Sequence, residues 1–332
     1  MDSKPVSHKS PGKFIALILV LLWFVVLSVI AINRQGLEDW WKLRDYHAPA
    51  TVQQLANQTT MTPFARKVFY VNAPDVEPAT SFAKSCSSKS EQTIVLGCYH
   101  SDQQGIFVLH VSDRRLDGIE QVTAAHEMLH AAYDRLSARD KTKVNSMLMD
   151  YYQHDLHDQR IMDTIAAYKQ TEPNDVVNEM HSVFGTEVAS LSSGLETYYQ
   201  RYFSDRAKIV AFANQYQAEF TSRQDQIKQD DATLATQKTQ IDSNETTAKA
   251  DAINLAQQQT VLQNERSNGD ISAYNAGVPV YNAKVVTYNA EVTNIQALVN
   301  QYNLLVNARN AIALEAKQLT SEITSQVSPI SQ

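Results

Sequence analysis

The chain has 332 residues and a formal net charge of −7 at pH 7, a length that allows one or two domains with accessory segments. Lys and Arg are scattered along it, without the basic stripe that a phosphate backbone requires, which excludes an ordinary nucleic-acid-binding protein. The two cysteines, Cys86 and Cys98, are too few for a four-thiolate zinc site.

The first distinct segment of the chain is apolar. Residues 14–32 contain no charged side chain, and as a helix they would cross about 30 Å of hydrocarbon. A cleaved signal peptide is the alternative, but its apolar region is normally shorter, and no A-x-A-like site follows residue 30. After a short tail at 1–13, the sequence therefore predicts a transmembrane anchor at 14–32.

The membrane orientation and the state of the cysteines depend on each other. The tail is short and poor in acids, and both cysteines follow the apolar segment, which favours an inside N-terminus. The expectation is a single-pass membrane protein whose remaining regions are extracytoplasmic. In that oxidising compartment Cys86 and Cys98 would form a disulfide worth about 2–3 kcal/mol. Two unrelated buried thiols are the alternative.

A polar juxtamembrane linker at 33–60 precedes a region, 61–202, that changes character twice. Short apolar, β-branched runs separated by Pro and Ser predict strands of a small sheet at 67–72, 93–100 and 106–111. After Gly118 the apolar period becomes helical. Further helices are expected from Ser137, over 158–169, and over 176–184 with an end at Gly185. The region reads as an α+β domain.

The last region, 203–327, is rich in Gln, Asn, Thr and Ala and carries heptads. Apolar side chains recur every seven residues at Phe220, Ile227, Leu234, Ile241, Ala248, Leu255 and Leu262, then at Val278, Val285, Val292, Val299 and Val306, with Tyr281, Tyr288, Ile295 and Tyr302. A turn signal at 266–270 separates the two series. The pattern predicts an antiparallel coiled-coil hairpin.

The first arm of this hairpin has a thin apolar face, since its second seam position is polar at Arg223 and Asp230. A coiled-coil partner or a homodimer would cover that face. A rigid spacer and a docking or dimerisation arm both fit the sequence.

The chemistry-bearing motif is the five-residue stretch from His126 to His130, in the expected helix after Gly118. Residues four apart share one helix face, so both imidazoles can reach a single zinc ion, and Glu127 can act as general base on a water beside it. Zinc would lower the pKa of that water towards 7. The flanking residues are small, as a buried ligand helix requires. The alternative is two ordinary histidines.

With this motif the chain resembles the zincin superfamily of metallopeptidases over roughly residues 65–200. The resemblance implies a small zincin-like catalytic domain at 61–202, with a third zinc ligand downstream. Tyr133 and Leu136 depart from the metzincin extension. The stretch 178–182, Asn-Glu-Met-His-Ser, matches the gluzincin form, which makes Glu179 the expected third ligand. Val183 stands where some gluzincins carry Asp, so no partner for a ligand histidine is assigned.

Other residues compete for roles at this site. His154, His157 and His181 are rivals for the third ligand, and His181 cannot face the metal together with Glu179, since residues two apart point to nearly opposite sides of a helix. Candidate donors to a transition-state oxyanion are His181, Tyr198, Tyr199 and Arg201. Packing of the tyrosines between the two regions is the alternative.

The sequence therefore predicts a membrane-anchored zinc peptidase that acts on protein or peptide substrates. An endopeptidase is favoured over an exopeptidase. The strand at 106–111, if its edge is open, could pair with an extended substrate. The alternative function is a cell-surface interaction or scaffold protein, in which the coiled coil acts and the zinc site is structural or inactive. Glu127 favours the enzyme, because a structural site needs no general base.

Overall fold

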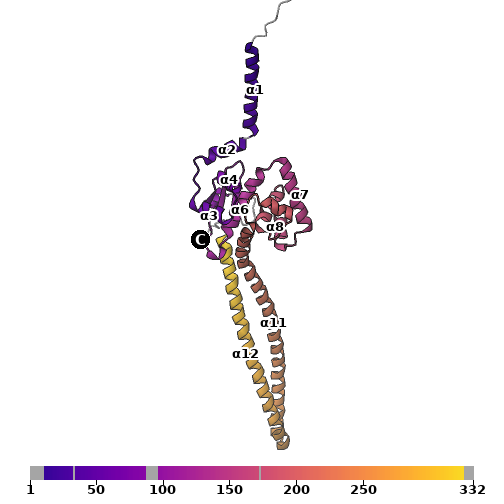
Figure 1. Cartoon of the computed structure of the whole chain (residues 1–332). Coiled ribbons are helices and arrows are strands. Elements are labelled where there is room, and N and C mark those ends of the chain that lie inside the picture. Colours follow the sequence, from indigo (N-terminus) through magenta and orange to yellow (C-terminus); the bar gives the residue numbers. More distant parts are fainter. Residues whose placement is uncertain (1–10, 33, 87–95, 172, 325–332) are drawn as a thin grey trace, which may run out of the picture. The chain divides into compact units, whose positions relative to one another are not determined.

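The computed structural model describes residues 11–32, 34–86, 96–171 and 173–324 (Figure 1). The chain divides into two compact units. The first runs to Gln215 and includes Ile323, and the second is Tyr216–Glu322.

Helices dominate the first unit. Before the second strand they are α1 Pro11–Ile32, α2 Arg34–Leu43, α3 Ala50–Gln58, α4 Pro63–Val71 and α5 Ala79–Ser85. After the third strand come a 3-10 helix η1 Arg114–Leu116, α6 Ile119–Asp134, α7 Ala138–His154, α8 Gln159–Thr171, α9 Val176–Glu187 and α10 Ser193–Tyr199. The helix expected from Ser137 is confirmed, since the Ser137 hydroxyl accepts a hydrogen bond from the Asp140 amide at 3.1 Å.

The sheet is small. Its strands are β1 Asp75–Glu77, β2 Gly97–His100 and β3 Gly105–Leu109, in the order β1-β3-β2. Strand β3 pairs in parallel with β1 and antiparallel with β2, where Cys98 lies opposite Phe107. Helices make up 78% of the structure, so the predicted α+β class is wrong and the fold is mainly α-helical.

The error arises from short apolar runs, which do not distinguish a strand from a buried helix. Of residues 67–72, expected as a strand, 67–71 belong to α4 and Asn72 caps its C-terminus. This helix starts where the Thr62 hydroxyl accepts a hydrogen bond from the Ala65 amide and Pro63 provides a preset first helical φ. Of the run 93–100, residues 93–95 lie outside the described residues, and β2 begins at Gly97. The linker expected at 33–60 carries α2 and α3.

The expected open edge at 106–111 is also wrong. Strand β3 lies in the middle of the sheet and has a neighbour on each side. Within the described parts of the chain, β2 pairs only with β3, so β2 is an edge strand next to α6.

The membrane expectation is corrected as well. A spanning helix needs about 20 consecutive, predominantly apolar residues. No helix within the described residues is long and apolar enough to cross a membrane, and this includes α1, which contains 14–32. The predicted transmembrane anchor, and with it the single-pass membrane localisation, is therefore contradicted.

Helix α6 lies at the centre of the first unit. Its main neighbours are α9, α3, α4, β2 and β3. Small side chains at Ala124, Ala125, Ala131 and Ala132 are at most 2% exposed, so the neighbouring elements approach the helix closely. The residues that follow Gly118 in sequence are therefore held in a close-packed core.

The second unit consists of two long helices, α11 Arg206–Ser267 from Tyr216 onward and α12 Ile271–Glu322 (Figure 1). Ion pairs join them in antiparallel order. Arg223 contacts Glu315 at 3.3 Å, and Arg309 contacts Asp231 at 2.9 Å. Gly269, with φ of +82°, lies in the turn between them. This helical hairpin occupies the stretch where the heptads occur.

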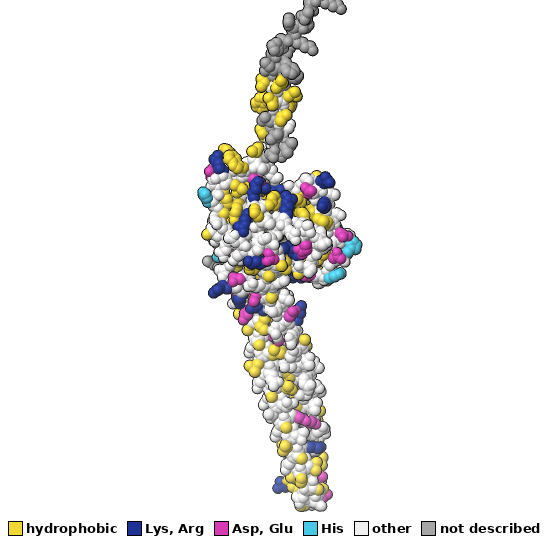
Figure 2. All heavy atoms as spheres, in the orientation of Figure 1, with side chains coloured by type: hydrophobic (Ala, Val, Ile, Leu, Met, Phe, Trp, Pro, Cys, Tyr) yellow, Lys and Arg dark blue, Asp and Glu magenta, His cyan; other side chains and the backbone are white. Residues whose placement is uncertain are grey.

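The seam of the hairpin is only partly covered by the two helices. Ile241, Ala248 and Leu255 on α11 are buried, whereas Val285 and Tyr288 on α12 are half-exposed. On the face drawn in Figure 2, the hairpin carries scattered apolar side chains and few charged ones. The partner or homodimer predicted from the sequence remains an expectation for this surface.

Candidate metal centre

Two helices bring three metal-ligating side chains together. His126 and His130 lie one turn apart on α6, and Glu179 lies in the first turn of α9. The Nε2 atom of His126 is 3.5 Å from one carboxylate oxygen of Glu179, and Nε2 of His130 is 3.4 Å from the other. All three ligand atoms lie within 4.8 Å of one another. No other such group occurs in the described part of the chain.

These separations suit a tetrahedral ion. Two ligands each about 2.1 Å from tetrahedral zinc are about 3.4 Å apart. An ordinary N–H···O hydrogen bond is shorter, about 2.9 Å. The Oε2 atom of Glu179 is buried without a hydrogen-bond partner, so the carboxylate has an unsatisfied acceptor directed into the group. The donor set, two imidazoles and one carboxylate, therefore fits zinc.

The charge state of Glu179 fits the same role. Burial would raise the pKa of the Glu179 carboxyl, but the charge of His130, the charge and polar side chain of His126, and the nearby Tyr168 side chain together outweigh it. The pKa falls to about 2, so the carboxylate is ionised at neutral pH. An ionised carboxylate is the form that binds a metal ion.

A glycine allows the two ligand helices to approach closely. Gly185 lies within α9, and a Cβ atom there would stand 2.5 Å from Cδ1 of Leu129 and 2.8 Å from Cε1 of Tyr199. Leu129 and Tyr199 are fully buried. The sequence predicts that the helix ends at Gly185, but α9 continues to Glu187. Gly185 therefore serves close packing and does not end the helix.

Glu127, the expected general base, lies beside the ligand group on α6 and is 7% exposed. Its side chain packs against β2, where a Cβ atom at Gly97 would stand 2.8 Å from both Cγ and Oε1 of Glu127. The carboxylate therefore rests between the ligand helix and an edge strand.

The rival ligands lie elsewhere. His154, at the end of α7, has a side chain 66% exposed and contacts Asp150, and His157 is exposed in the following loop. His181 is fully buried, and its Nε2 lies 2.8 Å from the Tyr198 hydroxyl. Burial, with the charges of His130 and His126, lowers the pKa of His181 to about 3, so its imidazole is neutral.

Two of the expected oxyanion donors, Tyr198 and Tyr199, pack with Tyr202 around His181. The Tyr198 hydroxyl also lies 3.1 Å from the Tyr202 hydroxyl. The Tyr199 hydroxyl donates to the backbone carbonyl of His181 at 2.7 Å, and Arg201 stacks over Phe64. Each donor thus has a local partner within the packing around α10.

Sequence reasoning missed several residues of this neighbourhood. Tyr168 on α8 hydrogen-bonds Glu179, and Asp175, just before α9, accepts a hydrogen bond from Asn178 at 3.0 Å. Burial raises the pKa of Asp175, although Asn178 and the charge of His130 oppose the effect. Tyr168 belongs to a different helix, so no local signal links it to the motif.

The chain matches no protein-family model, and neither a curated protein nor a solved structure matches it significantly. The class that the site defines is a candidate metal centre with a buried acid beside it. Function is therefore inferred from this geometry.

Proposed function

We propose that this chain is a zinc-dependent peptidase of the zincin type, with the gluzincin ligand set His126, His130 and Glu179. The observation that carries the proposal is the convergence of the ligand atoms of these three side chains within 4.8 Å. Glu127 lies on α6, the helix of the two histidines. The orphaned oxygen of Glu179 supports a cation at this position.

Each residue of the candidate site has a defined role in this proposal. A bound zinc ion would lower the pKa of water and polarise the substrate carbonyl. Glu127 takes the proton from the attacking water and delivers it to the leaving amine. Its burial beside β2 fixes the direction from which it acts, and the ligand helices α6 and α9 keep the metal group rigid.

Within the described residues, the outer edge of β2 has no strand partner, which supports a peptide as the substrate class. An extended segment can add to an exposed sheet edge through main-chain hydrogen bonds. Strand β2 carries Gly97, which touches Glu127, so a peptide paired along this edge would run beside the general base. Recognition by main-chain atoms suits an endopeptidase, because neither chain end is required.

The test is Glu127→Ala in the full chain. We expect zinc binding to persist and peptide hydrolysis to fall by at least about 100-fold, the usual contribution of a general base. Glu38→Ala is the control, since Glu38 is exposed on α2 and pairs only with Arg34 in the described structure. Retained hydrolysis in Glu127→Ala would contradict the mechanism and favour a structural zinc site in an interaction protein.

A further inference from the structure

The edge strand β2 leaves no room for a side chain at Gly97, where it faces the proposed general base. A Cβ atom at Gly97 would stand 2.5 Å from Cγ2 of Thr123 and 2.8 Å from two atoms of Glu127. Real Cβ atoms essentially never approach other heavy atoms this closely. The backbone of β2 at Gly97 therefore fills the space directly behind the Glu127 side chain.

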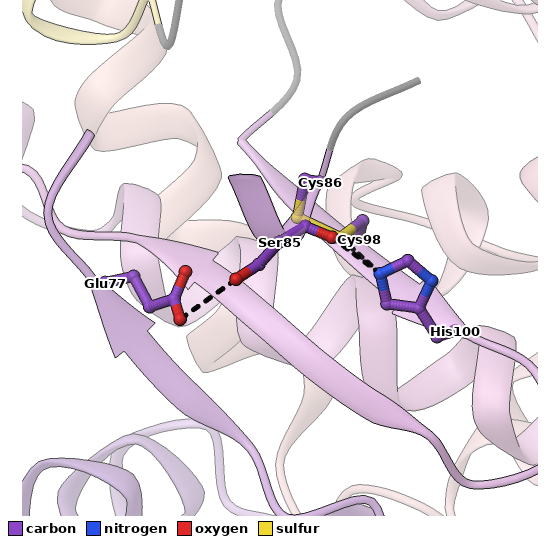
Figure 3. The surroundings of a disulfide bond; sticks show 5 residues. All are labelled: Glu77, Ser85, Cys86, Cys98 and His100. Carbon is purple, nitrogen blue, oxygen red and sulfur yellow. Dashed lines mark hydrogen bonds between the residues drawn. A yellow bond between two sulfur atoms is a disulfide. The ribbon is translucent and has the colours of Figure 1, made fainter. Parts of the chain in front are cut away.

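The next residue of β2 is covalently tied. Cys98 forms a disulfide with Cys86, the residue that caps the C-terminus of α5, and their Cα atoms are 5.8 Å apart (Figure 3). His100 adds a second tie, since its Nε2 lies 2.7 Å from the backbone oxygen of Ser85. Ser85 in turn donates to the Glu77 carboxylate of β1 at 3.1 Å.

These contacts give β2 support that its sheet does not provide. The strand has four residues and, in the described structure, hydrogen-bonds only to β3. Short edge strands open locally more easily than strands paired on both sides, because fewer contacts hold them in place. The disulfide and the His100 contact hold β2 on the side opposite to α6.

We propose that Gly97 is a positioning residue for Glu127, and that the Cys86–Cys98 disulfide holds β2 so that Gly97 can fulfil this role. The proposal rests on the proposed function, since it assigns Glu127 as the base. In the proposed function Glu127 acts on the attacking water, whereas Gly97 and the disulfide act through Glu127.

The disulfide makes the arrangement sensitive to dithiol reductants. A dithiol transfers two electrons and two protons to the bond between the Cys86 and Cys98 sulfurs and becomes a disulfide itself. The two protein thiols are then free to separate, and β2 loses its one covalent tie to α5 while its pairing with β3, its packing against α6 and the His100 contact remain. Turnover therefore falls on reduction, while the zinc ligands on α6 and α9 are untouched.

Gly97→Ala tests the positioning role. We expect kcat to fall more than about tenfold, because a general base contributes at least about 100-fold and misplacement forfeits part of it. KM and zinc content should change little. Gly194→Ala is the matched control, since its Cβ would meet only Met147 Sδ at 3.6 Å. Equal kcat in the two variants would overturn the role of Gly97.

A rescue variant separates positioning from stability. Thr123→Ser removes Cγ2, the atom nearest the added Cβ, but leaves the contacts with Glu127. Gly97→Ala with Thr123→Ser should recover most of the unfolding midpoint that Gly97→Ala loses, and kcat should stay low. If kcat returns together with the midpoint, Gly97 is only a packing residue.

The disulfide is tested in the full chain with Cys86→Ser and Cys98→Ser combined. We expect kcat to fall about tenfold with zinc content unchanged, as a modest displacement of a catalytic group predicts. An unchanged kcat would overturn the role of the disulfide.

A thermodynamic cycle distinguishes failure of this proposal from failure of the proposed function. In a Glu127→Ala background, Gly97→Ala should cost less stability, because two of the three close contacts are absent. This coupling is measured by unfolding and needs neither zinc nor hydrolysis. Coupling without hydrolysis in the wild type would refute the peptidase only. Absence of coupling would refute the contact on which positioning depends.

Discussion

Asp39 provides a buried ion pair whose removal has a predictable cost. Its side chain is 3% exposed and lies on α2, where the carboxylate receives two hydrogen bonds from Arg135, at 3.0 and 2.8 Å. Lys67 on α4 lies 2.9 Å away. Arg135 caps the C-terminus of α6, the helix that carries His126 and His130, so this network joins α2 and α4 to the end of the ligand helix.

Asp39→Asn keeps the shape of the side chain and leaves Arg135 without a counter-charge. Breaking a buried pair in this way costs about 3–5 kcal/mol. Asparagine still accepts one hydrogen bond and Lys67 is 43% exposed, so the lower end, about 3 kcal/mol, applies. For a unit of this size the midpoint of thermal unfolding should fall by about 6–12 °C.

The pKa of Asp39 predicts how the stability difference between wild type and Asp39→Asn changes with pH. Burial would raise the pKa of the Asp39 carboxyl, but hydrogen bonds and charges from Arg135 and Lys67 lower it below its ordinary value. A carboxyl with a lowered folded-state pKa stabilises the protein above its unfolded value, about 3.9, and the stabilisation is lost as pH falls through the folded value. The difference between wild type and Asp39→Asn should therefore shrink below about pH 4.

The assay is thermal unfolding followed by near-ultraviolet circular dichroism, which reports the buried tyrosines of the first unit. Asp45→Asn is the control, because Asp45 is 76% exposed and pairs with its neighbour Arg44. Its cost should stay within about 0.5 kcal/mol. Equal midpoints for Asp39→Asn and Asp45→Asn at pH 7, or a difference that persists unchanged at pH 3, would refute the reasoning.

Two further substitutions test the ligand helices. Glu179→Gln keeps the volume of the side chain but should weaken zinc binding at least about tenfold in a competition titration with a chelator, because a ligand is lost; Glu187→Gln, on the same helix, should not. Gly185→Ala should lower the free energy of unfolding by about 1–3 kcal/mol through overpacking against Leu129, which denaturant titration measures. A Gly185→Ala variant as stable as Gly194→Ala would contradict that packing argument.

Local patterns in the sequence were enough to predict the long helices and the candidate metal motif. The heptads predicted two helices with a turn near residue 268, and α11 and α12 occupy this stretch. The spacing of His126 and His130 follows from helix geometry alone, and Glu179 came from a short resemblance. These features depend on neighbours in sequence, so a single chain reveals them.

Features that depend on tertiary contacts were missed or misread. The sequence shows Asp39 as one acid in a polar linker, and only the folded chain brings Arg135 and Lys67 to it. Gly97 and Gly185 matter because of side chains far away in sequence. The sequence also contained evidence against the strand predicted at 67–72, since Thr62 followed by Pro63 is a typical helix start.

The most direct test of the central claim is the zinc content of the purified full chain after dialysis, measured by elemental analysis beside Glu179→Gln. The ligand set predicts about one zinc per wild-type chain and a clear loss in the variant, in keeping with a three-residue protein site. A folded wild-type chain with no zinc would contradict the metal centre, and the peptidase proposal with it.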